Sequence, residues 1–395
     1  MSYRVLIVED HPFQHEYLLN LFNEQADVCV ESAKDGSEAL ECVKKQRFDL
    51  VLTDLMMPGM DGVQFIQKLA KLPHKPALAI MSTASRRIIG SASLAAKSMG
   101  LSVIGQLSKP VVALGVSKLI ERLDTLHAGA KPTARYNVVP DRKMLERALS
   151  QGELVAWFQP KKSLVDGRIV AAEALARWVH PEHGVLMPAT FLPAMIKFGL
   201  LEELLWLFIE QTITAQENWK KQRFDIPVSI NLPTCMLDSD DLADRLHAFV
   251  LARGGNPARL SFELMESSTT RDISRYYAGA CRIRMKGFGL AQDDFGQGYS
   301  SYFNLVSTPF TELKIDRALV HGCVENESLA AALGSIIALG RKLGLDVVAE
   351  GVETQEELAL LRDLQCERVQ GFLISPAVSV SHFYDLLNAD EPGMH

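Results

Sequence analysis

The sequence contains no continuous apolar stretch of about 18 residues, the length that a helix needs to cross a bilayer. Its first residues, MSYRVLIVEDHPF, reach Glu9 and Asp10 after one short apolar segment, which is not the pattern of a signal peptide. The six cysteines include no C-x-x-C pair, so they predict no zinc site. We therefore expect a cytoplasmic protein with reduced thiols and no membrane partner.

Basic residues are not in excess either. The 395 residues include 41 lysines and arginines against 48 acidic residues, a formal net charge of −7. Residues 1–128 hold 14 of each kind, so the acidic excess lies in the rest of the chain. This balance predicts no DNA partner, because nonspecific nucleic-acid binding needs clustered positive charge. If the acidic part acts on an anionic substrate, metal ions are the simplest source of positive charge.

The length and a hydrophobic fraction of 48% predict a folded protein of two or three domains. In the first 127 residues, stretches of helical character separate short apolar segments at 4–8, 50–52, 78–81 and 103–104. Such alternation predicts a doubly wound parallel sheet, an α/β fold. Functional groups of such a sheet gather at the carboxyl ends of its strands.

Polar residues stand at the ends of these expected strands. They are Glu9, Asp10, Asp54, Ser82 and Lys109. The third strand could end one residue later, which makes Thr83 an alternative to Ser82. Three carboxylates placed together repel one another unless a divalent cation lies among them, and oxygen ligands suit Mg²⁺. A carboxylate beside Mg²⁺ and an ammonium group can attack a phosphoryl group. The alternative is that these acids cap helices and stay hydrated.

This set of residues resembles that of the receiver domain of two-component response regulators, over residues 1–127. The resemblance implies a flavodoxin-like fold in which Asp54 accepts a phosphoryl group from a cognate sensor histidine kinase. Glu9 and Asp10 would hold Mg²⁺. Ser82 would sense the phosphoryl group and Lys109 would pair with it.

Residues 128–140, AGAKPTARYNVVP, combine small residues and prolines without periodicity, which predicts a linker. A helix is expected at 143–154, either as a signalling helix between domains or packed on the domain that follows. Residues 141–395 then repeat strand and helix in about eight units, which predicts a (β/α)₈-type barrel. The expected strands lie at 155–158, 169–176, 228–232, 260–264, 288–291, 313–315, 347–349 and around 369–372, and helices are expected at 202–214 and 329–343.

Polar residues also mark the ends of the barrel strands. They are Glu173, Asn231, Glu263, Glu266, Asp293, Asp294, Lys314, Asp316, Glu350, Glu353 and Gln370. A single acid at such a place could be a helix cap, but so many oxygen ligands on one barrel face suit Mg²⁺ or Mn²⁺. The adjacent acids Asp293 and Asp294 can let one carboxylate bridge two ions, an arrangement that serves in-line phosphoryl displacement.

The same residues belong to ordered sequence motifs. These are EALARW at 173–178, FELMES at 262–267, DDFGQGYSS at 293–301, LKIDR at 313–317, AEGVET at 349–354 and QGF at 370–372. With them the chain resembles EAL-domain cyclic di-GMP phosphodiesterases over about residues 140–388. The resemblance implies a modified (β/α)₈ TIM-like barrel that hydrolyses cyclic di-GMP to linear 5′-pGpG with two Mg²⁺ or Mn²⁺ ions.

The resemblance also implies how the two ions would be held. The ligands of one ion would be Glu173, Asn231, Glu263 and Asp293. Those of the other would be Asp293, Asp294 and Glu350. A water molecule between the ions would attack the phosphorus atom.

Further roles follow from the same resemblance. Lys314 would position or deprotonate the attacking water, and Glu353 would orient the substrate or a metal-bound water. Glu266 would hold the loop at 293–301 in place. The residues in contact with the substrate would be Gln159, Arg177, Asp316 and Gln370, with the arginine paired to a phosphate.

Some positions depart from the two families. Gln106 stands where receivers usually have an aromatic residue, and Val111 where they have phenylalanine, which affects how phosphorylation is transmitted. In the barrel, Gln297 stands where the family usually has a small residue, and Phe158 stands where tyrosine is common. Residues 376–377 stand where the family usually has a basic residue followed by proline. These changes bear on control by the loop and on substrate affinity, and none of them removes a metal ligand.

The sequence has no GGDEF signature, so the barrel itself would be the output of the receiver. Two alternatives belong to other classes of function. The barrel could be a catalytically silent cyclic di-GMP sensor that acts through protein partners, which degenerate ligands would favour. It could also be a docking scaffold, which lost substrate contacts would favour. We expect a homodimer or higher oligomer, because both families commonly self-associate.

Overall fold

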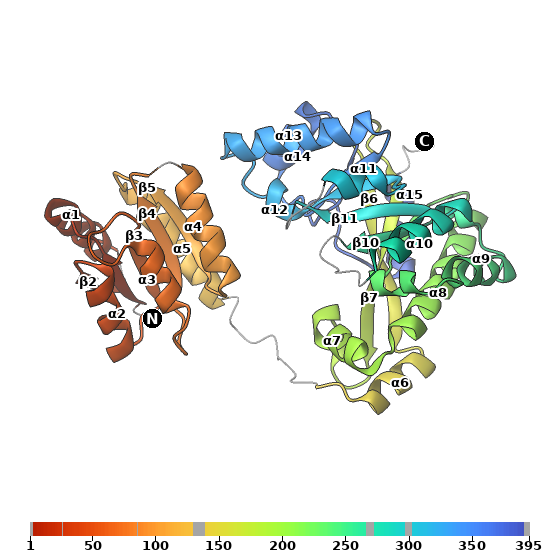
Figure 1. Cartoon of the computed structure of the whole chain (residues 1–395), viewed down its shortest axis with the longest axis horizontal. Helices are drawn as coiled ribbons and strands as arrows, with labels where there is room; N and C mark the ends of the chain where they lie inside the picture. Colours follow the sequence, from red (N-terminus) through yellow and green to blue (C-terminus); the bar gives the residue numbers. More distant parts are fainter. Residues whose placement is uncertain are drawn as a thin grey trace. The chain divides into compact units, whose positions relative to one another are not determined.

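The computed structural model describes residues 3–25, 27–84, 86–128, 139–265, 272–296 and 302–390 (Figure 1). The chain divides into two compact units, Met1–Arg135 and Tyr136–His395, and each is described by itself. Among the residues described, no helix combines the length and the apolar character that a membrane crossing requires.

The first unit is built on a five-stranded parallel sheet with the strand order β2-β1-β3-β4-β5. Apolar side chains on its two faces pack into two separate clusters with the helices, which explains the continuous apolar segments of the inner strands. The predicted doubly wound sheet is thus confirmed. Its elements are β1 (Tyr3–Val8), α1 (Pro12–Asn23), β2 (Val28–Ala33), α2 (Gly36–Lys45), β3 (Leu50–Asp54), α3 (Gly62–Leu69), β4 (Ala77–Ser82), α4 (Arg86–Ser98), β5 (Val103–Ser108) and α5 (Ala113–Ala128).

The second unit contains a closed ring of eight strands in the order β6-β14-β13-β12-β11-β10-β9-β7, with β6 paired to β7 and with β8 added beside β7. β6 runs antiparallel to both neighbours in the ring, whereas the other neighbouring pairs are parallel. The link from β6 to β7 is too short for the crossover that parallel pairing needs. The prediction of a modified (β/α)₈ barrel is confirmed.

The bounds of the barrel elements follow. The strands are β6 (Leu154–Ser163), β7 (Ile169–His180), β8 (Gly184–Leu186), β9 (Val228–Asn231), β10 (Leu260–Met265), β11 (Gly289–Phe295), β12 (Glu312–Ile315), β13 (Asp346–Ala349) and β14 (Arg368–Val369). The helices are α6 (Arg142–Ser150), α7 (Pro188–Phe198), α8 (Leu201–Lys221), η1 (Thr234–Asp238), α9 (Leu242–Ala252), η2 (Pro257–Arg259), α10 (Ile273–Met285), α11 (Tyr302–Ser307), α12 (Arg317–Val320), α13 (Glu327–Lys342), α14 (Gln355–Asp363) and α15 (Val380–Asp390).

Several of the expected element bounds are wrong by one or more residues, and for two of them the structure shows the cause. The helix expected at 143–154 ends at Ser150, because Gly152 takes a left-handed conformation with φ of 70° before β6 begins. The last expected strand, around 369–372, is reduced to β14. Gly371 instead packs on the backbone of Val352, whose carbonyl oxygen would lie 2.2 Å from an added Cβ atom.

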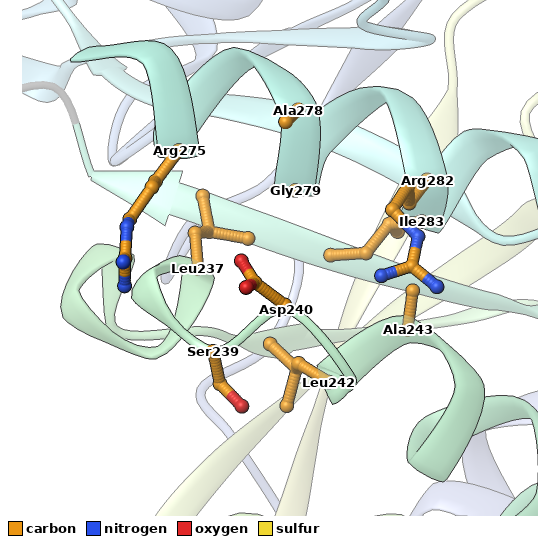
Figure 2. Close-up of a pocket in the computed structure, with 10 residues that line it drawn as sticks. All are labelled: Leu237, Ser239, Asp240, Leu242, Ala243, Arg275, Ala278, Gly279, Arg282 and Ile283. Carbon is orange, nitrogen blue, oxygen red and sulfur yellow. The ribbon is translucent and has the colours of Figure 1, made fainter. Parts of the chain in front are cut away.

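A small pocket in the second unit lies between α10 and the segment that joins η1 to α9 (Figure 2). Its volume of about 30 Å³ is too small for a nucleotide. Arg282 at this pocket pairs with Asp244, and Arg275 donates a hydrogen bond to the carbonyl oxygen of Asp238. Its lining includes none of the site residues expected from the sequence.

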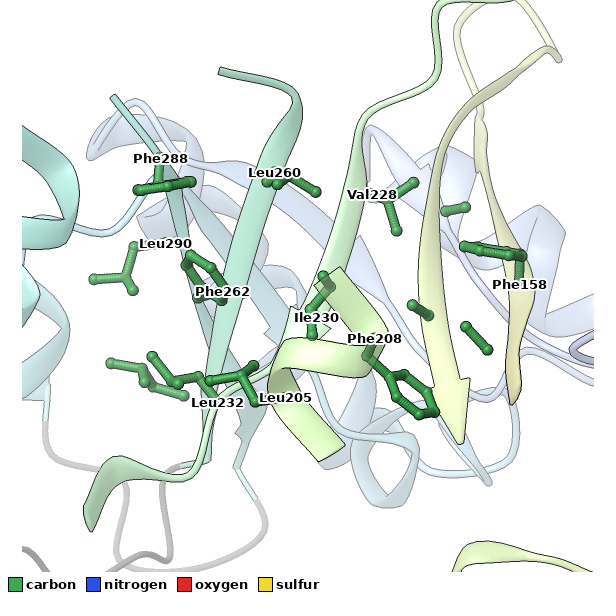
Figure 3. Close-up of a cluster of buried hydrophobic side chains, with 14 of the residues drawn as sticks. Phe158, Leu205, Phe208, Val228, Ile230, Leu232, Leu260, Phe262, Phe288 and Leu290 are labelled. Carbon is green, nitrogen blue, oxygen red and sulfur yellow. The ribbon is translucent and has the colours of Figure 1, made fainter. Parts of the chain in front are cut away.

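The main core of the second unit lies between the barrel strands and the surrounding helices (Figure 3). Phe158, Ile230 and Phe262 come from three strands and join Leu205 and Phe208 of α8 in this cluster. Because side chains alternate along a strand, residues next to these core residues face the inside of the barrel. This alternation places the polar residues described below inside the ring.

Candidate active site

Six parallel barrel strands bring together six of the expected site residues, although Glu173 lies within β7 and does not end it as expected, because β7 continues to His180. Five of these residues lie on β7, β9, β10, β11 and β12, and the sixth directly follows β13. They are Glu173, Asn231, Glu263, Asp293, Lys314 and Glu350. The amide nitrogen of Asn231 donates a hydrogen bond to Glu173 Oε1 at 3.1 Å, which joins the first two expected ligand positions.

Lys314 lies at the centre of this group and is almost completely buried. Its Nζ is 2.7 Å from Glu263 Oε2 and 2.8 Å from both Asp293 Oδ1 and Glu350 Oε1. Glu173 Oε2 lies 3.2 Å away. Burial opposes the charged form of this lysine, but the surrounding carboxylates outweigh it and hold its pKa well above the usual value. Lys314 is therefore an ammonium group in this arrangement.

The carboxylates respond to burial and to one another. Burial raises the pKa of Glu350 to about 8 and that of Glu173 to about 7, and neighbouring carboxylates add to both shifts. Burial would also raise the pKa of Glu263, but Lys314 and Lys161 together lower it to about 2. Four carboxylates share the single positive charge of Lys314, so this charge cannot balance all of them when they are ionised.

Asp293 and Asp294 would face opposite sides of a regular strand, because side chains alternate. The register between β11 and β12 shifts between Gln292 and Phe295, and Asp294 adopts a left-handed conformation with φ of 54°. This irregularity inserts an extra residue, as a β-bulge does. Aspartate tolerates the left-handed region better than most residues, so an aspartate at position 294 suits the backbone conformation as well as a role as an oxygen ligand.

The donor set fits divalent cations. Carboxylate oxygens of Asp293, Asp294 and Glu350 lie within 4.8 Å of one another. Burial is the largest cause that raises the pKa of Asp294, and the charges of Asp293 and Asp316 add to it. Together they bring this pKa to about 6. Carboxylate oxygens in this number suit Mg²⁺ or Mn²⁺, which would relieve the repulsion between them.

The raised pKa values of Glu173 and Glu350 predict a pH effect on the protein in EDTA. Groups whose folded pKa is raised stabilise the fold below their unfolded pKa, and this contribution is lost as pH rises through the folded pKa. We expect the free energy of unfolding to fall by about 6 kcal/mol between pH 5 and pH 8 if both shifts apply in full. Denaturant titrations across this range test it, and Glu350→Gln should flatten the slope. A stability that stays level or increases in the wild-type protein would contradict the expected charge repulsion.

Gln159 and Gln370, which are expected to bind the substrate, form a hydrogen bond with each other. Gln370 also contacts Glu173, an expected metal ligand. Gln370 Nε2 donates hydrogen bonds to Glu173 Oε2 at 2.7 Å and to Gln159 Oε1 at 3.0 Å. Gln159 Nε2 in turn donates to the carbonyl oxygen of Ser375 at 3.1 Å. The side chain of Gln370 is buried, so in this arrangement it orients Glu173.

The other expected substrate residues occupy different surroundings. The Arg177 guanidinium lies 5.7 Å from the centre of the Trp157 ring and donates to the carbonyl oxygen of Ala176. Asp316 is buried and caps α12 by accepting a hydrogen bond from the Ala318 amide at 2.8 Å. The side chain of Glu353 is 48% exposed, so it can reach a bound molecule.

Glu266 and residues 297–301 of the expected control loop lie outside the described residues, as does the departure at Gln297. Lys161 was not predicted as a site residue from the sequence. Lys161 on β6 is fully buried and contacts Glu263, Glu312 and Ser229. Its signal in the sequence is a lysine two positions after Gln159, on the same face of a largely apolar strand.

The receiver residues also meet at the carboxyl ends of their strands. Oxygens of Glu9, Asp10 and Asp54 lie within 4.8 Å of one another. Lys109 Nζ pairs with Asp54 and lies 2.6 Å from Glu9 Oε2. This arrangement can hold a divalent cation beside Asp54, with an ammonium group on the other side.

The two hydroxyl alternatives differ in their surroundings. Ser82 ends β4 and is buried, and its Oγ accepts a hydrogen bond from the Ala84 amide at 3.1 Å. Thr83 is exposed. Gly62, at the start of α3, lies so close to the strand that an added Cβ atom would be 2.1 Å from the carbonyl oxygen of Asp54. A glycine is needed there to pack the start of α3 against the backbone of Asp54.

Comparison with known proteins identifies the family. The EAL domain model matches residues 142–377, and the response regulator receiver domain model matches residues 5–123. The chain belongs to the EAL family. Its first unit is a receiver domain, so the protein combines a receiver with an EAL barrel.

Relatives of this EAL protein include both full-length and partial matches. Cyclic di-GMP phosphodiesterase RocR of Pseudomonas aeruginosa is 31% identical over 96% of this chain and 97% of RocR. The bifunctional diguanylate cyclase/cyclic di-GMP phosphodiesterase MucR of the same organism is 35% identical, over 58% of this chain and 34% of MucR. The solved structure of the PaMucR phosphodiesterase in complex with c-di-GMP covers 60% of this chain and 97% of its own, with 33% identity and a TM-score of 0.57.

Proposed function

We propose that this protein hydrolyses cyclic di-GMP to linear 5′-pGpG and that phosphorylation of Asp54 modulates the reaction. The observation that carries the proposal is the convergence of four carboxylates on Lys314 Nζ inside an EAL barrel. The likeness to RocR along both units supports the substrate and the link to the receiver.

The EAL site would hold two Mg²⁺ or Mn²⁺ ions, and the receiver one Mg²⁺. The ligands of the first ion would be Glu173, Asn231, Glu263 and Asp293, and those of the second would be Asp293, Asp294 and Glu350. Bound ions supply an activated water and neutralise the charge of the phosphodiester. Glu9, Asp10 and Asp54 form the corresponding oxygen cluster of the receiver.

The residues of the chain then position the reacting groups. Attack of water on phosphorus breaks the bond to the 3′ oxygen and leaves a 5′-phosphate. Lys314 lies 2.7 to 3.2 Å from four carboxylates, so it would orient the water or take up its proton, and its ammonium group would stabilise negative charge. Asn231 and Gln370 donate hydrogen bonds that fix Glu173, and the half-exposed Glu353 would be available to the substrate. Arg177 would pair with a phosphate of the substrate.

The experiment is an assay of cyclic di-GMP with the purified protein and Mg²⁺ or Mn²⁺, beside Glu173→Ala and analysed by chromatography. We expect linear pGpG from the wild-type protein alone, because the substitution removes a ligand. Tight binding of the dinucleotide without any product would contradict the proposal and indicate a sensor.

Control by the receiver gives a separate prediction. Asp54→Asn should retain turnover without phosphodonor, because the EAL site is unchanged, but should lose any change in turnover that a phosphodonor causes. The test compares initial rates of both proteins with and without beryllofluoride, a phosphoryl analogue that requires the aspartate. An unchanged response in the variant would refute Asp54 as the acceptor.

A further inference from the structure

Lys161 joins four strands of the barrel through its ammonium group. From β6, its Nζ donates hydrogen bonds to Ser229 Oγ on β9 at 2.8 Å, to Glu263 Oε1 on β10 at 3.1 Å and to Glu312 Oε1 on β12 at 2.5 Å. The side chain is fully buried. A buried ammonium is very unfavourable unless its donors are satisfied, and three acceptors match its three donors.

The contact with Glu263 divides this carboxylate between two lysines. Oε1 accepts from Lys161, whereas Oε2 accepts from Lys314 at 2.7 Å. Glu263 is also fully buried, so bulk solvent does not reach either oxygen. The plane of the carboxylate is therefore fixed at both ends, with Oε2 directed to the centre of the site.

The charge of Lys161 has a second partner that takes no part in the site. Glu312 pairs with Lys161, and its other oxygen lies 3.7 Å from Arg368. Lys161 and Glu312 could be replaced together by neutral residues of similar size without changing the net charge of the interior. If Lys161 served only to balance the charge of Glu312, the double exchange would leave the site unchanged. The hydrogen bond from Lys161 to Glu263 would be lost in either case.

We propose that Lys161 is a positioning residue for the EAL reaction, which fixes Glu263 so that Oε2 is presented to Lys314 and to the metal ion that this glutamate holds. The inference rests on the proposed function. Partners that orient a metal ligand typically contribute 10–100-fold to metal affinity or activity.

The test uses the full-length protein with Lys161→Met, Glu312→Gln and the double variant. Mn²⁺ affinity is measured from the electron paramagnetic resonance of the free ion, and kcat with cyclic di-GMP. We expect the double variant to fold, to bind Mn²⁺ about 10–100-fold more weakly and to lose kcat. If the single Lys161→Met protein does not fold, the double variant decides the result.

The matched control is Lys162→Met. Lys162 is the next residue, half-buried, and pairs with Asp390 at 2.7 Å on the outside of the barrel. It should keep the wild-type Mn²⁺ affinity and kcat. A folded double variant with wild-type Mn²⁺ affinity overturns the proposal, and so does an equal loss in Glu312→Gln alone. If the wild-type protein does not hydrolyse cyclic di-GMP, the proposed function fails, while the Mn²⁺ affinities still decide the role of Lys161.

Discussion

Replacing Asp293 with asparagine should lower kcat/KM for cyclic di-GMP by about 1000-fold or more, equivalent to about 4 kcal/mol of transition-state stabilisation. Asp293 belongs to both proposed ligand sets. Its Oδ1 is 2.8 Å from Lys314, and its side chain is buried. Asparagine has nearly the same size, so the loss reflects the missing charge and not a cavity.

The control for this variant is Asp363→Asn, at the exposed end of α14. It should keep the wild-type rate. Rates of both proteins are compared at saturating Mn²⁺, and Mn²⁺ binding is measured in parallel. A rate for Asp293→Asn within about tenfold of wild type would show that this carboxylate does not bridge the reacting ions.

Lys314→Met should remove turnover and also destabilise the protein in EDTA by about 3–5 kcal/mol, the usual cost of removing one partner of a buried ion pair. The substitution leaves Glu173, Glu263, Asp293 and Glu350 without the ammonium that they share. Because divalent ions can replace that charge, Mn²⁺ should raise the unfolding temperature of the variant more than that of the wild-type protein.

Thermal unfolding in EDTA and in Mn²⁺ gives the comparison, with Lys162→Met as the matched loss of a lysine. Lys162 pairs with a single carboxylate and is 31% exposed, so its removal should change stability little. Equal unfolding temperatures for Lys314→Met and the wild-type protein in EDTA would disprove the central role of Lys314 in balancing the carboxylates.

The strands that are buried on both faces could be predicted from the sequence, because burial on both sides requires continuous apolar segments. β2 could not be found this way. It is an edge strand with mostly half-buried side chains, and its sequence VCVESA has only a short apolar segment. The antiparallel pairing of β6 with β7 could not be predicted either, because both strands fit the regular alternation of strands and helices.

The acids of the site could be predicted because each lies in a recognisable motif, and all of them except Glu173 lie near the end of a strand. Their orientation could not. A regular strand would turn Asp294 away from Asp293, and the bulge that prevents this depends on the pairing of β11 with β12. Lys161 and Lys162 form a similar case, because two adjacent lysines suggest a solvated pair. Only closure of the barrel shows that one of them faces inward.

The most direct measurement is product analysis of the wild-type reaction with cyclic di-GMP and Mn²⁺ in ¹⁸O-labelled water. We expect linear pGpG with one ¹⁸O atom on its 5′-phosphate, because water attacks phosphorus and the 3′ oxygen leaves. Cyclic di-GMP recovered unchanged from protein that binds it, or pGpG without the label, would contradict hydrolysis by water at the EAL site.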